Sequence, residues 1–218
     1  MARNVERDRR EAQRRKDRLM AEGFRLFSKY GIDAVSLQRV ADAAEVGAAT
    51  MYKYFQTKEK LVIAISGKVW GEVWQDVLSR RVPDELERLT AYQGVEFYAD
   101  QIIRMYQERP ELLHFSSEYK TFICHSGVED AQLREHLDVL EPIRSLFHRM
   151  YERAKVDGSI RTDIPEQQMF TTVVITMLSV AERYAQGIVW ANDHKADHTQ
   201  ELVFLKEMLL TWCAGKNP

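Results

Sequence analysis

Apolar residues recur along most of the chain at three- and four-residue spacing, the period of an amphipathic helix. The stretch from Arg9 to Tyr30 is typical, with apolar or small residues at 19, 20, 23, 24, 26 and 27. Gly31 follows it and suits the positive φ at which many helices end. Strand patterns are nearly absent: no Asn-Gly hairpin and no sustained alternation occur. The pattern predicts an all-α fold of about nine helices.

Start and stop residues divide the pattern into elements. Ser36 is placed to cap a short helix over 37–44, and Thr57 to cap a longer one over about 58–80. Pro110 ends the helix before it, and Pro142 is expected to kink a later one. The remaining predicted helices cover 48–54, 83–109, 110–125, 129–156, 166–191 and about 198–214.

Composition narrows the class of protein. The chain has 218 residues, 45% of them hydrophobic, and a mean hydropathy of −0.41, which fits a soluble protein with a sizeable core. Apolar runs such as "TTVVITML" are shorter than the ~18 residues that a membrane span needs. The basic start lacks the apolar region of a secretory signal. Cys124 and Cys213 give neither a disulfide framework nor metal spacing. We therefore expect a cytoplasmic protein that uses no cofactor, no metal and no membrane.

Charge is distributed unevenly along the chain. Residues 1–60 hold 14 Lys+Arg and 9 Asp+Glu, whereas the remainder holds 17 and 24, so the overall charge of −2 conceals a basic N-terminal part. A basic segment joined to an acidic remainder indicates that the first part contacts a polyanion. The alternative is a solvated, charge-rich first helix.

The stretch "EVGAATMYKYF", residues 45–55, carries three aromatic residues within four positions. Together with "LQRVADAA" it has the pattern of a helix-turn-helix, whose second helix enters the DNA major groove. Small Ala41 lies where the two helices must cross. We expect the paired face to consist of Val40, Ala41, Ala44, Val46, Met51 and Tyr54, with Phe55 as an anchor in the local core.

The segment "LMAEGFRLFSKYGIDAVSLQRVADAAEVGAATMYKYFQTKEKLV" resembles the N-terminal domain of the TetR family of bacterial transcriptional regulators. The resemblance covers about residues 13–73 without a gap, and the "TxYxYF…KEKL" ending is its most specific feature. It implies a DNA-binding helix-turn-helix over 36–55 and a ligand-binding, dimer-forming domain over 74–218. A basic arm over 1–12 is hypothesised to add phosphate or minor-groove contacts.

Two departures from the family pattern concern the turn and the start of the second helix. Glu45 stands where the family usually has glycine, and a glutamate at positive φ costs about 1–2 kcal/mol. Gly47 and Ala48 stand where the family often has Ser-Lys, which removes one capping hydroxyl and one cation.

DNA contacts are predicted from residues at or near helix starts and on the second helix. Phenol, hydroxyl and ammonium groups there can bind phosphates, and a few side chains can reach base edges. Arg39 is equally compatible with a surface ion pair, and Tyr52 with core packing. The predicted DNA-binding residues are Ser36, Gln38, Arg39, Gly47, Ala48, Ala49, Thr50, Tyr52, Lys53, Tyr54 and Lys58.

The strongly apolar helices 166–191 and 200–214 predict a four-helix homodimer interface, unless both are buried within one subunit. Its expected residues are Val173, Met177, Val180, Ala181, Tyr184, Leu205, Met208, Leu209 and Trp212. Two paired subunits would bind a palindromic operator with half-sites about 34–36 Å apart.

The middle helices carry many aromatic residues, which line apolar ligand cavities but also fill ordinary cores. A small apolar or aromatic effector is expected to contact Phe97, Gln101, Met105, His114, Glu118, Phe122, Phe147 and Tyr151.

Three readings of function follow from these patterns. A ligand-released homodimeric repressor is favoured, and an activator or other DNA-binding regulator without a small ligand is the alternative. An enzyme is disfavoured, because the chain has no glycine-rich phosphate loop, nucleophile elbow, His-Glu-x-x-His or cysteine cluster. His194 and His198 are four residues apart, but no third metal ligand is apparent and a solvated loop is expected there.

Overall fold

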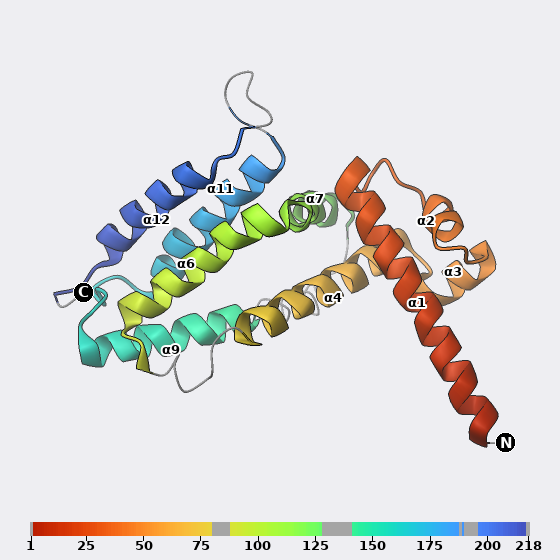
Figure 1. Ribbon diagram of the computed structural model, residues 1–218, viewed down its shortest axis with the longest axis horizontal. Coiled ribbons are helices and arrows are strands. Elements are labelled where there is room, and N and C mark those ends of the chain that lie inside the picture. The colour runs from red at the N-terminus through yellow and green to blue at the C-terminus, as the bar shows by residue number, and fades with distance from the viewer. Residues whose placement is uncertain (1, 80–87, 128–140, 188, 190–195, 217–218) are drawn as a thin grey trace. The chain divides into compact units, whose positions relative to one another are not determined.

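A computed structural model of the chain describes residues 2–79, 88–127, 141–187, 189 and 196–216. The regular elements among these residues are helical, apart from one isolated antiparallel bridge between Ile160 and Ala214. Counting the continuous rod from 166 to 185 once, the described part forms nine helices (Figure 1), so the all-α prediction is confirmed. No helix in the described part has the length and apolar content required to span a membrane.

The chain divides into two units, and each is described by itself. The first contains the described parts of Met1–Trp70 and Phe115–His136, and the second those of Gly71–His114 and Leu137–Pro218. The division falls within two helices, α4 (Lys58–Ser79) and α7 (Pro110–His125).

The first unit surrounds the long helix α1 (Ala2–Tyr30), with α2 (Leu37–Ala43) and α3 (Ala48–Phe55) packed in succession. Gly23 allows α1 to approach α4 closely, because a Cβ there would lie 2.7 Å from the Cδ1 atom of Ile65. The core includes the fully buried side chains Leu19, Phe27, Ile32, Val40, Met51 and Leu61. This core holds the short helices α2 and α3, which are too short to be stable alone.

Helix α1 begins at Ala2, not near Arg9 as predicted. Ion pairs four residues apart extend it: Arg7 Nε lies 3.2 Å from Glu11 Oε1, and Arg10 Nη2 lies 2.7 Å from Glu6 Oε1. Such pairs each add a few tenths of a kcal/mol to helix stability. The sequence prediction was wrong because it weighed apolar periodicity and neglected charge pairing.

The second unit is built around α6 (Ala91–Glu108). This helix packs against α9 (Glu141–Asp157), α11 (Thr176–Ala185) and α12 (Thr199–Cys213), as Figure 1 shows. Lys206 Nζ on α12 lies 2.8 Å from Asp100 Oδ1 on α6. The apolar cluster between these helices includes Phe147, Tyr151, Met169 and Val173.

Within the range 83–109, predicted as one helix, α6 begins at Ala91, after a break at residues 89 and 90 that follows helical Arg88. Thr90 caps it: its hydroxyl accepts from Gln93 N at 3.2 Å, and Gln93 Oε1 accepts from Thr90 N at 3.0 Å. This reciprocal capping box was overlooked in the sequence. Residues 83–87 lie outside the described part.

Pro142 is the second described residue of α9, and the kink expected there stays a prediction. The predicted residues 129–140 lie outside the described part.

The predicted helix over 166–191 is one rod with a change of pitch. It consists of α10 (Glu166–Phe170), the π-helical segment η2 (Thr171–Ile175) and α11. Thr171 and Thr172 donate their hydroxyl hydrogens to the carbonyls of Gln167 and Gln168 at 2.9 and 2.8 Å, which bends a helix locally. The rod ends at Ala185, earlier than predicted, because Gly187 has φ 68°.

Candidate DNA interface

The helix-turn-helix over 36–55 is formed as the sequence predicts. Ser36 caps α2, since its Oγ accepts from Arg39 N at 3.2 Å. Val40, Ala41 and Met51 are completely buried between the two helices, and Ala44, Val46 and Phe55 nearly so. Tyr54 is only half-buried, so it lies at the border of the predicted paired face.

The turn between the helices places Glu45 at φ 53°. Glu45 N donates to Asp42 O at 3.1 Å, and Val46 N donates to Ala41 O at 2.9 Å, so the turn is closed by backbone hydrogen bonds. The left-handed conformation expected from the family pattern is thus adopted by a residue with a Cβ. This costs about 1–2 kcal/mol relative to an ordinary conformation.

Helix α3 presents a small exposed face. Ala49, Tyr52 and Lys53 are exposed at helical spacing, and the side chain of Tyr52 is half accessible to solvent. Ala48, Thr50 and Tyr54 are half-buried beside them. Gly47, the N-cap, makes no side-chain capping bond. The exposed face therefore offers one methyl group, one phenol and one ammonium group, which suit a thymine methyl, a phosphate and a guanine edge.

The exposed residues of α2 are partly engaged already. Gln38 Nε2 donates to Asp42 Oδ1 at 2.7 Å, one turn further along the helix. Arg39 lies over the ring of Tyr30, with its guanidinium carbon 4.3 Å from the ring centroid. Arg39 is thus held by a cation–π contact rather than by the surface ion pair that was its alternative reading.

Tyr30 is a residue that the sequence analysis missed as a candidate for the interface. Its ring is 43% exposed and lies between Lys29 and Arg39, with Lys29 Nζ 5.2 Å from the ring centroid. The hydrogen bond and positive charge of Lys29, with Arg39 nearby, lower the pKa of the Tyr30 phenol. The sequence signal was available: a tyrosine at the end of a helix, next to a lysine.

Lys58 joins two segments instead of projecting freely. Its Nζ donates to Asp33 O at 3.2 Å and lies 5.6 Å from the ring centroid of Phe122 on α7. Burial lowers the pKa of this ammonium group, although Asp33 and Glu59 oppose the shift.

The predicted effector residues do not lie in one place. Glu118 and Phe122 belong to the first unit, where Glu118 Oε2 lies against Gly31 and Phe122 against Lys58. The others, Phe97, Gln101, Met105, His114, Phe147 and Tyr151, belong to the second unit.

Two of these residues are core side chains of the second unit. Phe147 packs edge-on to Phe170 at 5.3 Å, and the Tyr151 hydroxyl donates to Ile164 O at 2.6 Å. Gln101 and Met105 instead border a hollow of about 30 Å³ between α4 and α6, which has room for about two waters.

The predicted dimer residues fall into two groups. Val173, Met177 and Ala181 are buried within the second unit, whereas Met208 and Trp212 are 69% and 37% exposed. Phe204, which the prediction omitted, is 53% exposed one turn before Met208. The half-buried members are Val180, Tyr184, Leu205 and Leu209. Tyr184 stacks on His198 with ring centroids 4.6 Å apart.

Ligand atoms of His148, Glu152 and Glu166 lie within 4.8 Å of one another on α9 and α10. All three side chains are at least one-third exposed, and Lys155 already hydrogen-bonds Glu152. The sequence also has two histidines four residues apart, His194 and His198. His194 lies outside the described residues.

Comparison with known proteins points to one family for the helix-turn-helix segment. The sequence profile described as "Bacterial regulatory proteins, tetR family" matches residues 19–65, which include the whole motif described above. Residues 19–65 thus match the DNA-binding domain of the TetR family. The protein is therefore similar to bacterial transcriptional regulators.

Similar proteins match this chain beyond residues 19–65. The HTH-type transcriptional repressor KstR of Mycobacterium tuberculosis is 28% identical over 154 residues, and that of Mycolicibacterium smegmatis is 29% identical over 154 residues. Each alignment covers 70% of this chain, and it spans 64% and 69% of the respective relatives. The chain thus matches slightly less than two thirds of the M. tuberculosis protein's length.

Solved structures share the fold over nearly the whole chain. The fatty acid degradation regulator FadR from Bacillus halodurans has a TM-score of 0.68 at 16% identity, covering 89% of this chain and 94% of its own. FadR from Bacillus subtilis, solved with stearoyl-CoA, has a TM-score of 0.67 at 13% identity, covering 89% and 97%. At these identities the likeness concerns the fold alone.

Proposed function

We propose that the protein is a homodimeric, sequence-specific DNA-binding repressor that binds a palindromic operator and is released by a small apolar or aromatic molecule. The exposed face of α3 carries this proposal. Its residues Ala49, Tyr52 and Lys53 stand outward on a motif whose inner face is buried. A helix with this placement reads base edges in the major groove while neighbouring groups bind phosphates.

Repression is supported by the KstR relatives, which are described as transcriptional repressors. A cytoplasmic location follows from the proposal, because the protein must reach the chromosome.

Homodimer formation is supported by the apolar stripe of α12, which we define as Phe204, Met208 and Trp212. These residues are four apart, lie on one face and are all substantially exposed. A stripe of this kind is costly in water and is typical of a helix that pairs with another. Two copies related by a twofold axis would cover each other's stripes and hold two α3 helices at a fixed spacing.

An effector is supported by the aromatic residues of the second unit and by the B. subtilis FadR structure, which contains stearoyl-CoA. Long acyl-CoA thioesters are therefore among the molecules to test. The alternative, a regulator without a small ligand, is favoured by one observation: Phe147 and Tyr151 are packed into the core.

The proposal is tested by selecting duplexes from a random DNA library with the purified protein. We expect an enriched sequence with twofold symmetry, bound by two subunits. Acyl-CoA thioesters and planar aromatic compounds are then screened for release of that duplex. Enrichment of an asymmetric site bound by one subunit would contradict the homodimeric part, and no enrichment at all would contradict DNA recognition.

A further inference from the structure

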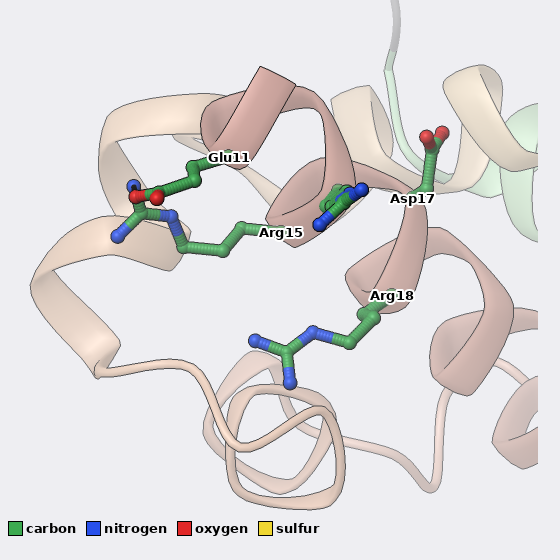
Figure 2. A pocket seen from close by; sticks show the side chains of 5 residues that line it. Glu11, Arg15, Asp17 and Arg18 are labelled. Atoms are coloured by element: carbon green, nitrogen blue, oxygen red, sulfur yellow. Dashed lines mark ion pairs between the residues drawn. The ribbon is translucent and has the colours of Figure 1, made fainter. Parts of the chain in front are cut away.

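Charged side chains gather in both units, with opposite preferences for a ligand. In the first unit, Arg15 and Arg18 extend into a hollow beside α1, and Glu11 and Asp17 also line it (Figure 2). Arginines outnumber carboxylates in this lining, so the hollow does not suit a metal cation. The second unit carries a cluster of the other kind, in which one histidine and two carboxylates converge.

The cluster consists of His148 and Glu152, one turn apart on α9, and Glu166 in the first turn of α10. Their ligand atoms lie within 4.8 Å of one another, and His148 Nδ1 is 3.0 Å from Glu166 Oε2. Two atoms bound to one tetrahedral zinc ion at about 2.0–2.2 Å are about 3.4 Å apart. Small rotations of the side chains therefore bring all three donors to one ion.

The backbone on both sides of the cluster is held by the core of the second unit. Phe147 packs edge-on to Phe170 with ring centroids 5.3 Å apart, which joins α9 to α10. The Tyr151 hydroxyl donates to Ile164 O at 2.6 Å, two residues before Glu166. Because these contacts already fix the two helices to each other, metal binding has to order only three side chains.

A cation of the chain itself already lies at the edge of this cluster. Lys155 Nζ donates a hydrogen bond to Glu152 Oε1. This bond, with the negative charges of Glu152 and Glu166, raises the pKa of the Lys155 ammonium group. The cluster thus attracts positive charge, and Lys155 is the competitor that a metal ion has to displace from Glu152.

The geometry points to a metal site at which His148, Glu152 and Glu166 together bind one zinc ion. One imidazole and two carboxylates suit zinc, whereas magnesium and calcium prefer oxygen donors alone. Water completes the coordination, because all three side chains are open to solvent. The set was not apparent in the sequence, since Glu166 is 18 residues from His148 and meets it only in the fold.

The bound ion links α9 to the start of the rod that continues through η2 into α11. It therefore stabilises the second unit by mass action, since the unfolded chain does not hold the three donors together. The site does not depend on the proposed function.

Zinc binding is measured by isothermal titration calorimetry on the full chain after dialysis against a chelator. The variants H148A and E166Q are compared with the wild type and with the controls H125A and E141Q. His125 on α7 and Glu141 on α9 are exposed and lie outside the cluster.

The wild type and both controls are expected to bind zinc with equal affinity. H148A and E166Q should bind at least about tenfold more weakly, since even groups outside a ligand set contribute about 10–100-fold to metal affinity. Wild-type zinc affinity in H148A, or no zinc binding by the wild type, would overturn the inference and leave the proposed function standing.

Lys155→Met provides a change in the opposite direction. Methionine keeps an apolar side chain beside the ring of Tyr151 but removes the competing ammonium group. Zinc affinity should rise by about two- to fivefold, the contribution of an exposed ion pair. Equal or weaker binding by K155M would overturn the assignment of Glu152 as a ligand.

Thermal unfolding gives a second readout that separates a site from loose attraction of cations. The melting temperature of the wild type should rise with zinc concentration, and that of H148A should not. Magnesium at the same concentrations should shift neither protein. A shift with zinc that H148A retains, or one that magnesium reproduces, would overturn the inference.

Discussion

Asp157 shows how a single side chain joins distant parts of the second unit. One carboxylate oxygen accepts from Ala91 N, at the start of α6, at 2.9 Å. The other accepts from Ser159 N at 2.8 Å and from the Ser159 hydroxyl at 2.7 Å. Burial raises the pKa of this carboxyl, but these hydrogen bonds lower it more, so the net shift is downward.

Asp157→Asn is expected to lower the free energy of unfolding by about 1 kcal/mol at neutral pH, after allowance for solvent screening. A lowered pKa stabilises the fold above the ordinary value of 3.8, and this contribution disappears as the pH falls through the lowered value. Urea unfolding at neutral and acid pH measures the difference between the two proteins, which should shrink in acid.

Asp163→Asn is the matched control for this change. Asp163 is mostly exposed and pairs with Arg161, an attraction that solvent largely screens. Its replacement should change the unfolding free energy little. A loss at Asp163 as large as that at Asp157, or one at Asp157 that persists unchanged in acid, would contradict this account of the helix junction.

At the scale of single residues, the sequence predicted the structural roles of some side chains better than those of others. Ser36 and Thr57 were assigned as caps because their hydroxyls precede helical periods, and both accept the expected backbone N–H bonds. Tyr30 and Arg39 were harder, because a contact between the end of one helix and the next depends on how the two helices cross. Such a contact appears in no sequence period.

At the scale of elements, two glycines have opposite roles. Gly215 follows α12, where a Cβ would lie 2.1 Å from the carbonyl oxygen of Gly158, and its N–H donates to Ser159 O at 2.9 Å. Gly71 lies inside α4 with nothing within 4 Å of an added Cβ. The first holds the chain end against the 158–160 segment, and the second only weakens its helix.

Gly215→Ala is therefore expected to destabilise the protein by about 1–3 kcal/mol, because backbone must shift to admit the methyl group. Gly71→Ala is expected to stabilise it by about 0.5–1 kcal/mol through helix propensity. Thermal and urea unfolding of the two variants should show shifts of opposite sign. Shifts of the same sign would mean that the close contact at Gly215 is wrongly described.

The elements that sequence predicted well are those with complete apolar periods and clear end residues, such as 110–125. The errors occurred where another force set the boundary. Charge pairs extend α1 towards Ala2, and a capping box sets the start of α6 at Ala91. Threonine hydroxyls at Thr171 and Thr172 accompany the change of helical pitch there. These effects depend on side-chain hydrogen bonds, which a pattern of apolar and polar positions does not record.

At the scale of the whole molecule, the apolar stripe of α12 predicts the oligomeric state. Met208→Glu places a charge in the middle of the stripe and should convert the dimer to a monomer at micromolar concentration, which sedimentation equilibrium measures. Operator affinity should fall by about tenfold or more, since two half-sites would no longer be bound together.

Val156→Glu is the control for this change, because Val156 is 89% exposed on α9 and lies outside the stripe. It should leave both the molecular mass and the operator affinity unchanged. A Met208→Glu protein that stays dimeric would show that the stripe is not the interface. The sequence predicted both helices as interface helices, but it could not show which of their faces are exposed on the subunit, because burial is a tertiary property.

The central claim is that the exposed face of α3 contacts DNA, and the most direct measurement is the affinity of Lys53→Gln for the duplex selected by the wild type. Lys155→Gln, on α9, removes the same charge elsewhere. Fluorescence anisotropy should show a loss of about tenfold or more for Lys53→Gln and wild-type affinity for Lys155→Gln. Equal affinities for the two variants and the wild type would contradict the claim.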